Sequence, residues 1–173
     1  MFDWKSLVLH YEKSRNEKSR NMWTDALGKL PRQDFYDYLV ERLSAVFPES
    51  CRVLADRILN FTECHPYYSQ QLAANVWQIG VLQPKSEDVL QAAVDHIVVS
   101  HALDYERIWM GFKRTNRWIL QRLAGGKTLQ DGEYRTSTIY SALKRLQKDG
   151  YAVYSDHYEL EDPFFRQWIL RQG

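Results

Sequence analysis

The chain of 173 residues has only two cysteines and no long apolar run. Cys51 and Cys64 both lie in sequence with a helical pattern, and no secretory signal peptide precedes them, so we expect free thiols and a cytoplasmic location. A membrane-spanning helix needs about 18 or more consecutive apolar residues, and Asp95, His96 and His101 interrupt the best candidate segment. We therefore expect a soluble protein with no membrane partner.

The five histidines do not form a metal-binding pattern. His96 and His101 are five positions apart, so they do not share a helix face as a pair of metal ligands would. Cys64 and His65 are neighbours in sequence, and neighbouring side chains point away from each other, which argues against a catalytic pair. We expect neither a bound metal nor a catalytic residue in this chain.

A phosphate-binding loop is also missing. Such a loop has the pattern Gly-x-x-x-x-Gly-Lys-Ser/Thr, in which backbone amides and the lysine hold the phosphates. Residues 125–128 match only the end of this pattern, because Gln121 stands where the first glycine is required. No apolar strand ending in Asp-Glu is present to hold magnesium. We therefore expect that this chain alone does not hydrolyse ATP.

Composition indicates a folded protein with uneven charge. Hydrophobic residues make up 45% of the sequence, which is enough to bury a core. The net charge of +1 hides a difference between two parts: residues 105–173 hold 12 Lys and Arg against 8 Asp and Glu, whereas residues 1–104 hold 11 against 14. The C-terminal part is therefore mildly basic.

Helical patterns fill the first hundred residues after a polar start. Residues 1–24 contain a repeated Glu-Lys-Ser-Arg-Asn stretch, which is typical of a solvated segment. Ser50 is expected to cap one of the helices that follow, and Trp77 to point inward. The sequence predicts a helical bundle over residues 25–104. Its helices are predicted at residues 31–47, 50–61, 66–77 and 86–98.

Two more helices are predicted in the last third of the chain. Apolar residues recur at helical spacing over residues 105–124, and Gly125-Gly126 supplies the left-handed conformation that ends a helix. After a polar stretch, Thr136 or Ser137 can cap a second helix, which Gly150 ends.

A hairpin and a closing helix follow. Residues 151–154 and 157–160 are short β-prone runs on either side of Ser155-Asp156, a plausible tight turn. Asp162-Pro163 then opens a helix with an aromatic face, Asp as its cap and Pro at its first position. We therefore predict a mainly α protein, in which the bundle precedes a winged-helix domain over residues 105–173 with the hairpin as its wing.

Several motifs together resemble one protein family. In their order and spacing they resemble the region downstream of the nucleotide core in prokaryotic, archaeal-type AAA+/STAND P-loop ATPases, and the match covers most of the chain. The motifs are Leu27-Gly28-Lys29-Leu30-Pro31, Asp34-Phe35, Cys64-His65-Pro66-Tyr67-Tyr68-Ser69-Gln70-Gln71-Leu72, Ile108-Trp109 and Tyr158-Glu159-Leu160-Glu161-Asp162-Pro163-Phe164-Phe165-Arg166-Gln167-Trp168.

The resemblance implies a helical lid with a Gly-His-Pro-Tyr-Tyr-like motif, followed by a winged helix. His65, Pro66 and Tyr67 would then face the nucleotide of an ATPase core, and the family usually has glycine where Cys64 stands. The region would be non-catalytic and would couple the nucleotide state of that core to a partner held by the winged helix. ATP and magnesium would be bound only by the core, so the chain would be a fragment or would have lost its ATPase half.

A free-standing regulator that binds duplex DNA is the alternative. A winged helix places its recognition helix in the major groove, with cations on the phosphates. The residues suited to these contacts are Arg135, Thr136, Thr138, Lys144, Arg145 and Lys148. Asp156 and Glu159 in the wing argue against DNA, because they would repel phosphates. A protein-interaction adaptor is the third possibility, and we expect it if the bundle covers this helix face.

Overall fold

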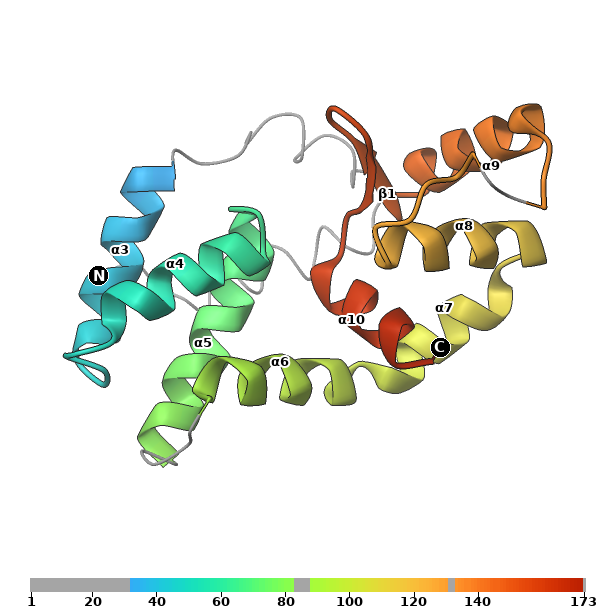
Figure 1. The fold of residues 1–173 in the computed structure, drawn as a ribbon. Helices are drawn as coiled ribbons and strands as arrows, with labels where there is room; N and C mark the ends of the chain where they lie inside the picture. The colour runs from blue at the N-terminus through green and yellow to red at the C-terminus, as the bar shows by residue number, and fades with distance from the viewer. Residues whose placement is uncertain (1–31, 83–87, 131–132, 173) are drawn as a thin grey trace.

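The computed structural model describes residues 32–82, 88–130 and 133–172. These residues form a mainly helical fold with a two-stranded antiparallel hairpin near the C-terminus (Figure 1). The polar segment 1–24 lies outside the described residues. Among the described helices, none is both long and apolar enough to cross a membrane. The elements are α3 (Arg32–Ser44), α4 (Cys51–Phe61), α5 (Pro66–Leu82), α6 (Val89–Ser100), α7 (Ala102–Gly111), α8 (Arg114–Ala124), α9 (Thr136–Lys148), β1 (Ala152–Tyr154), β2 (Tyr158–Leu160) and α10 (Pro163–Gln172).

Helices α3 to α6 occupy the part of the chain predicted as a bundle. Helix α3 packs on α4, and α5 packs on α6, which runs along the lower edge of Figure 1 toward α7. In α3, Phe35, Leu39 and Leu43 are buried at a spacing of four residues, so one side of the helix faces inward. The Phe47 ring lies directly over Gly80 of α5, where an added Cβ would stand 2.0 Å from Phe47 Cζ.

Helix α5 differs from the prediction in length and in one side chain. It continues to Leu82 instead of ending at Trp77. The side chain of Trp77 is 45% exposed, so the expectation that it points inward is wrong. Each residue turns a helix by about 100°, and Trp77 therefore falls outside the buried stripe formed by Leu72, Val76 and Gly80.

The single helix predicted over residues 105–124 is two helices, α7 and α8. The backbone of Phe112 is extended, with φ −78° and ψ 142°, and this ends α7. The Phe112 ring packs edge-on against the ring of Tyr151, which is distant in the sequence, with 4.8 Å between the two ring centroids. Arg117 stabilises the break, because its guanidinium donates to the carbonyl oxygens of Trp109 and Met110 at the end of α7, both at 3.0 Å. The periodicity of the sequence runs through this break and does not reveal it.

Two predicted serine or threonine caps are not formed. Ser50 stands at the cap position of α4, but its side chain makes no capping hydrogen bond. The cap residue of α9 is Arg135, whose extended backbone (φ −64°, ψ 144°) precedes the helix. Thr136 and Ser137 therefore lie inside the first turn, where a side chain no longer occupies the capping position.

Two aspartates cap helices, and one of these caps was predicted. Asp162 Oδ1 accepts hydrogen bonds from the backbone N–H groups of Phe164 at 2.8 Å and Phe165 at 3.1 Å, which confirms the predicted start of α10. Asp88 caps α6 by accepting from Gln91 N at 3.1 Å. Arg57 of α4 also donates to the Asp88 carboxylate at 2.9 Å, so this cap joins two helices.

The hairpin has the predicted position. Its register pairs Ala152 with Leu160 and Tyr154 with Tyr158, so residues 155–157 form the loop. His157 belongs to this loop and not to the second strand. Strand β1 packs on α9 and β2 packs on α8, which fixes the hairpin against both helices.

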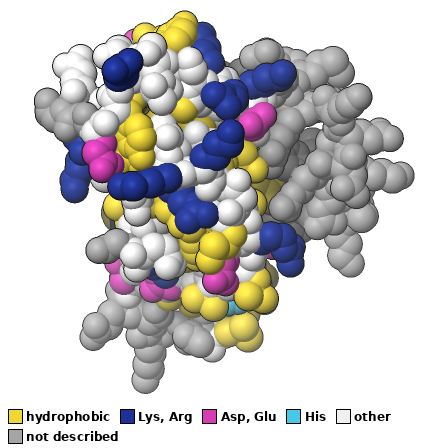
Figure 2. Space-filling view, turned by 90° about the vertical axis from the view of Figure 1, so that its right-hand side faces the viewer, with side chains coloured by type: hydrophobic (Ala, Val, Ile, Leu, Met, Phe, Trp, Pro, Cys, Tyr) yellow, Lys and Arg dark blue, Asp and Glu magenta, His cyan; other side chains and the backbone are white. Residues whose placement is uncertain are grey.

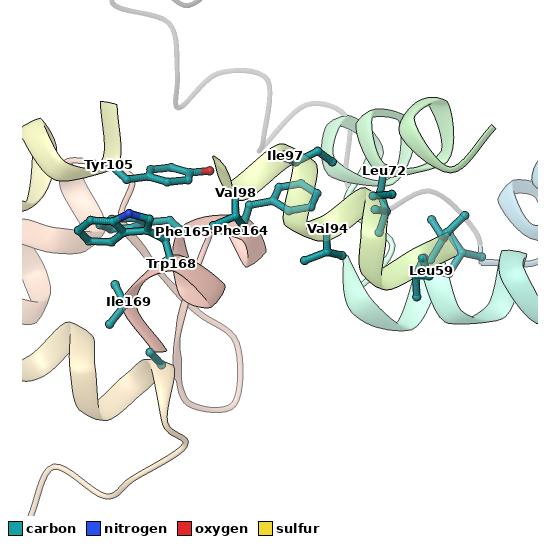
Figure 3. Close-up of a cluster of buried hydrophobic side chains, with 14 of the residues drawn as sticks. Leu59, Leu72, Val94, Ile97, Val98, Tyr105, Phe164, Phe165, Trp168 and Ile169 are labelled. Atoms are coloured by element: carbon teal, nitrogen blue, oxygen red, sulfur yellow. The ribbon is translucent and has the colours of Figure 1, made fainter. Parts of the chain in front are cut away.

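Helix α10 lies between the two predicted parts of the chain and contacts α6, α7 and α8. Four of its side chains are buried, and Figure 3 shows Phe165 and Trp168 beside Tyr105 of α7, and Phe164 beside Val98 of α6. The buried side chains form one continuous cluster from α3 to α10. The domain boundary between residues 104 and 105 stays a prediction. The buried residues of α10 are Phe164, Phe165, Trp168 and Ile169.

Candidate functional site

The residues predicted to face a nucleotide lie at the turn between α4 and α5. Glu63 and Cys64 have left-handed backbones, with φ 51° and 59°, a region that costs about 1–2 kcal/mol for residues other than glycine. Cys64 N donates to the Leu59 carbonyl at 3.0 Å, which closes the end of α4. Pro66 is the first residue of α5, where its fixed φ suits the start of a helix.

Two buried hydroxyl groups fix this turn. Thr62 Oγ1 donates to the Ile58 carbonyl at 2.8 Å and lies 2.5 Å from Ser69 Oγ. Thr62 and Ser69 are 2% and 0% exposed, so this pair is shielded from water and joins the end of α4 to the first turns of α5. Sequence reasoning missed the pair, because nothing local marks a threonine and a serine seven positions apart as partners.

Arg32 holds the start of α3 against the same turn. Its Nη2 donates to Asp56 Oδ1 at 3.0 Å and to Asn60 Oδ1 at 2.9 Å, and its Nη1 contacts Cys64 Sγ at 3.6 Å. The ion pair is about half exposed and contributes little stability by itself. Its main effect is on position, because the guanidinium at the start of α3 contacts both α4 and Cys64.

A series of ring contacts leads from the turn to α10. The rings of His65 and Tyr68 are 4.5 Å apart, and Tyr67 packs edge-on against Tyr68 at 5.3 Å. Tyr68 in turn packs edge-on against Phe164 of α10 at 6.0 Å, and Phe61 at the end of α4 lies 5.6 Å from the same ring. The turn that carries His65 and Tyr67 is therefore connected by direct contacts to the C-terminal helix.

The residues predicted to contact DNA or a partner form a second group on α9. All of them are exposed, and they are Arg135, Thr136, Thr138, Lys144, Arg145 and Lys148. The opposite side of α9 is buried through Ile139, Ala142, Leu143 and Leu146. Figure 2 views the end of the molecule where α8 and α9 lie, and Lys and Arg side chains are spread over it with fewer Asp and Glu.

The cations on α9 form no ion pair with any carboxylate of the described residues. Lys144 lies over the exposed ring of Tyr140, with its Nζ 5.6 Å from the ring centroid. Two nearby carboxylates are already paired, since Glu133 contacts Arg114 at 3.2 Å, and Glu159 in the hairpin contacts His157 at 2.6 Å.

The two groups do not form one site. The turn at residues 62–69 packs against α10, whereas α9 packs on α8 and β1. The exposed side of α9 is not covered by the bundle in the part of the chain that the structure describes. The protein-interaction adaptor stays a prediction.

A shallow, open hollow of about 520 Å³ lies beside α8. Its two arginines already have partners, because Arg117 binds the end of α7 and Arg114 pairs with Glu133. The hollow is thus lined by aromatic rings, and its two arginines are not available to bind a ligand together. It is lined by Trp109, Phe112, Arg114, Arg117, Trp118, Gln121 and Glu133.

Among the described residues, no three His, Cys, Asp or Glu side chains are grouped as a metal site would require. Comparison of the chain with protein-family models, with curated proteins and with solved structures finds no match.

Proposed function

We propose that this chain is the non-catalytic regulatory region of a P-loop ATPase, and that it couples the nucleotide state of the ATPase core to a partner. In this proposal residues 25–104 are the lid and residues 105–173 are a winged helix. The order α8, α9, β1, β2 supports a winged helix, as do the contacts of β1 with α9 and of β2 with α8.

The observation that carries the proposal is the series of ring contacts from His65 through Tyr68 to Phe164. A core that binds nucleotide against His65, Pro66 and Tyr67 would move the turn that holds these residues. Because closely packed side chains transmit displacement, the ring of Tyr68 would carry this movement to α10, which is packed on the helix α8 of the proposed winged helix.

The backbone of Cys64 also supports the resemblance to the ATPase family. Cys64 has φ 59°, a conformation that favours glycine. The family usually has glycine at this position of the motif. The turn thus has the backbone that a glycine would favour, although the residue is cysteine.

Affinity capture with controlled nucleotide tests the proposal. The chain is immobilised and exposed to a nucleotide-depleted extract of its source organism, to which Mg-ATP, Mg-ADP or EDTA is added. We expect mass spectrometry to identify a retained protein with a phosphate-binding loop, whose retention differs between ATP and ADP. His65→Ala with Tyr67→Ala should remove this retention, and Trp77→Ala, an exposed site elsewhere on α5, should leave it unchanged. If no such protein is retained under any of the three conditions, the proposal is wrong.

Duplex DNA binding is a second candidate, and one observation favours it. The cations of α9 are exposed and unpaired with described carboxylates, on a helix next to the hairpin. Fluorescence anisotropy with a mixed-sequence duplex, at low and physiological salt, tests this candidate. Four phosphate contacts predict a slope of log K against log salt of about −3.6, at about −0.9 per phosphate.

A matched pair of variants controls the DNA experiment. Lys144→Ala with Arg145→Ala should reduce the salt slope by about 1.8. Arg42→Ala with Arg52→Ala removes the same charge from α3 and α4 and should leave the slope unchanged. The combined replacement of Arg135, Lys144, Arg145 and Lys148 by alanine should abolish binding. Absence of binding at low salt would exclude this candidate.

A further inference from the structure

The outward face of α7 carries two large apolar side chains. Leu103 is 77% exposed and Met110 is 64% exposed, and they lie near the two ends of this helix. Tyr105, on the opposite side, is buried and its ring lies 5.1 Å from that of Phe165 in α10. Val99, one turn earlier at the end of α6, is 70% exposed. Apolar side chains scattered singly over a surface are ordinary, but a row of them along one helix marks an interaction surface.

Two residues of opposite charge lie between Leu103 and Met110. Glu106 and Arg107 are both exposed. Together with the two apolar residues they occupy positions i, i+3, i+4 and i+7, which share one face of a helix. Within the described part of the chain Glu106 forms no ion pair, and Arg107 pairs with Asp104 of the same helix at 3.2 Å. Because both side chains of this pair are more than half exposed, the pair contributes little, and Arg107 can exchange it for another carboxylate.

The order apolar, acidic, basic, apolar is complementary to itself. If two copies of α7 lie antiparallel about a two-fold axis between residues 106 and 107, Leu103 of each copy faces Met110 of the other. Glu106 of each copy then faces Arg107 of the other. Every contact occurs twice, as a closed symmetric dimer requires. A parallel pair in the same register would instead place Glu106 against Glu106 and Arg107 against Arg107, so the charges favour the antiparallel arrangement.

This face of α7 is separate from both groups of candidate site residues. None of its residues belongs to the turn at residues 62–69 or to α9. Figure 2 shows hydrophobic side chains beside Asp and Glu in the lower part of the viewed end, at the height at which Figure 1 draws α7. A contact through α7 therefore uses neither group, and it does not depend on the proposed ATPase coupling or on DNA binding.

We propose that this face of α7, formed by Leu103, Glu106, Arg107 and Met110, is the contact surface of a symmetric dimer of this chain, with the two copies of α7 antiparallel. One short helix face buries less than the roughly 1,200–2,000 Å² of a stable interface. The dimer is therefore weak and reversible, and we expect its dissociation constant to lie between about 10 µM and about 1 mM.

Sedimentation equilibrium of the full chain at low salt, from about 10 µM to about 1 mM, measures this association. We expect the average molar mass to rise with concentration from that of one chain toward that of two chains, and no further. The molar mass of one chain at every concentration would overturn the proposal and leave the face to a different kind of partner. Growth beyond two chains would also overturn it, because an antiparallel two-fold contact closes on itself.

Charge reversal tests the pairing of Glu106 with Arg107. Glu106→Arg and Arg107→Glu each place like charges opposite each other twice in the dimer, so each alone should weaken association at least about tenfold. An equal mixture of the two variants has opposite charges at both pairs and should associate at least as tightly as the unmodified protein. Glu41→Arg and Arg42→Glu, at an exposed acidic and basic pair on α3, are the matched controls and should associate like the unmodified protein.

The apolar part of the contact has its own pair of variants. Leu103→Ser removes two apolar contacts from the dimer and should weaken association by about tenfold or more. Leu82→Ser changes a leucine of similar exposure, 71%, at the end of α5 and should have no effect. If the mixture of Glu106→Arg with Arg107→Glu associates no better than either variant alone, or if Leu103→Ser behaves like Leu82→Ser, the proposed dimer contact is wrong.

Discussion

Replacement of Phe164 by alanine should destabilise the whole protein and not only α10. Phe164 is 1% exposed, and its ring contacts Phe61 at 5.6 Å and Tyr68 at 6.0 Å. These contacts join the C-terminal helix to α4 and α5. Because the buried side chains on both sides form one cluster, the loss of this ring affects the packing of both parts.

The size of the effect follows from two contributions. Removal of the ring from a fully buried site loses about 2 kcal/mol of transfer free energy. A cavity of about 80 Å³ left behind adds about 2 kcal/mol at about 24 cal/mol per Å³. We therefore expect the free energy of unfolding to fall by about 4 kcal/mol, which is a large part of the roughly 5–15 kcal/mol typical of a domain.

Urea unfolding followed by far-UV circular dichroism and tryptophan fluorescence measures this change. The midpoint should fall strongly, and both probes should report it together. Leu170→Ala, on the same helix but 46% exposed, is the matched control and should cost about 1 kcal/mol or less. Phe164→Leu, which keeps much of the volume, should cost less than about 1.5 kcal/mol. A loss for Phe164→Ala no larger than that for Leu170→Ala would refute the view that this ring joins the two parts.

Three further predictions concern backbone and caps. Gly80→Ala should lower the free energy of unfolding by about 1–3 kcal/mol through overpacking, because the added Cβ would lie 2.0 Å from the nearest carbon of the Phe47 ring. Gly111→Ala is the control: nothing lies within 4 Å of its added Cβ, so thermal unfolding should show it to be neutral or stabilising. Cys64→Gly should stabilise by about 1 kcal/mol, since it relieves the left-handed backbone at φ 59°; a loss of stability would show that the thiol contact matters more. Asp88→Ala should cost about 1 kcal/mol, mostly through the lost cap. The hydrogen bond from Arg57, with that from Gln91 N, lowers the pKa of Asp88 in the folded state. The contribution of ionised Asp88 to the free energy of unfolding is therefore present above about pH 4 and is lost as the pH falls through the lowered pKa. Measuring the free energy of unfolding against pH checks this, and Asp88→Ala should not show this loss of stability in acid.

Much of the local structure was readable from sequence, because it depends on residues close together in the chain. Apolar positions at spacings of three and four predicted the helices, and Asp162-Pro163 marked the start of α10. The two β-prone runs around Ser155-Asp156 predicted the hairpin. In each case one short stretch contains both the signal and the partners that satisfy it.

The tertiary structure alone decided how these elements meet. At the break between α7 and α8, the ring of Phe112 packs against that of Tyr151 from the hairpin, and the exposure of Trp77 depends on which side of α5 faces its neighbours. The contact of Tyr68 with Phe164 joins residues 96 positions apart, which no periodicity can indicate. Sequence periodicity shows that a helix has an apolar face, but the partner of that face is chosen by packing between segments distant in the chain.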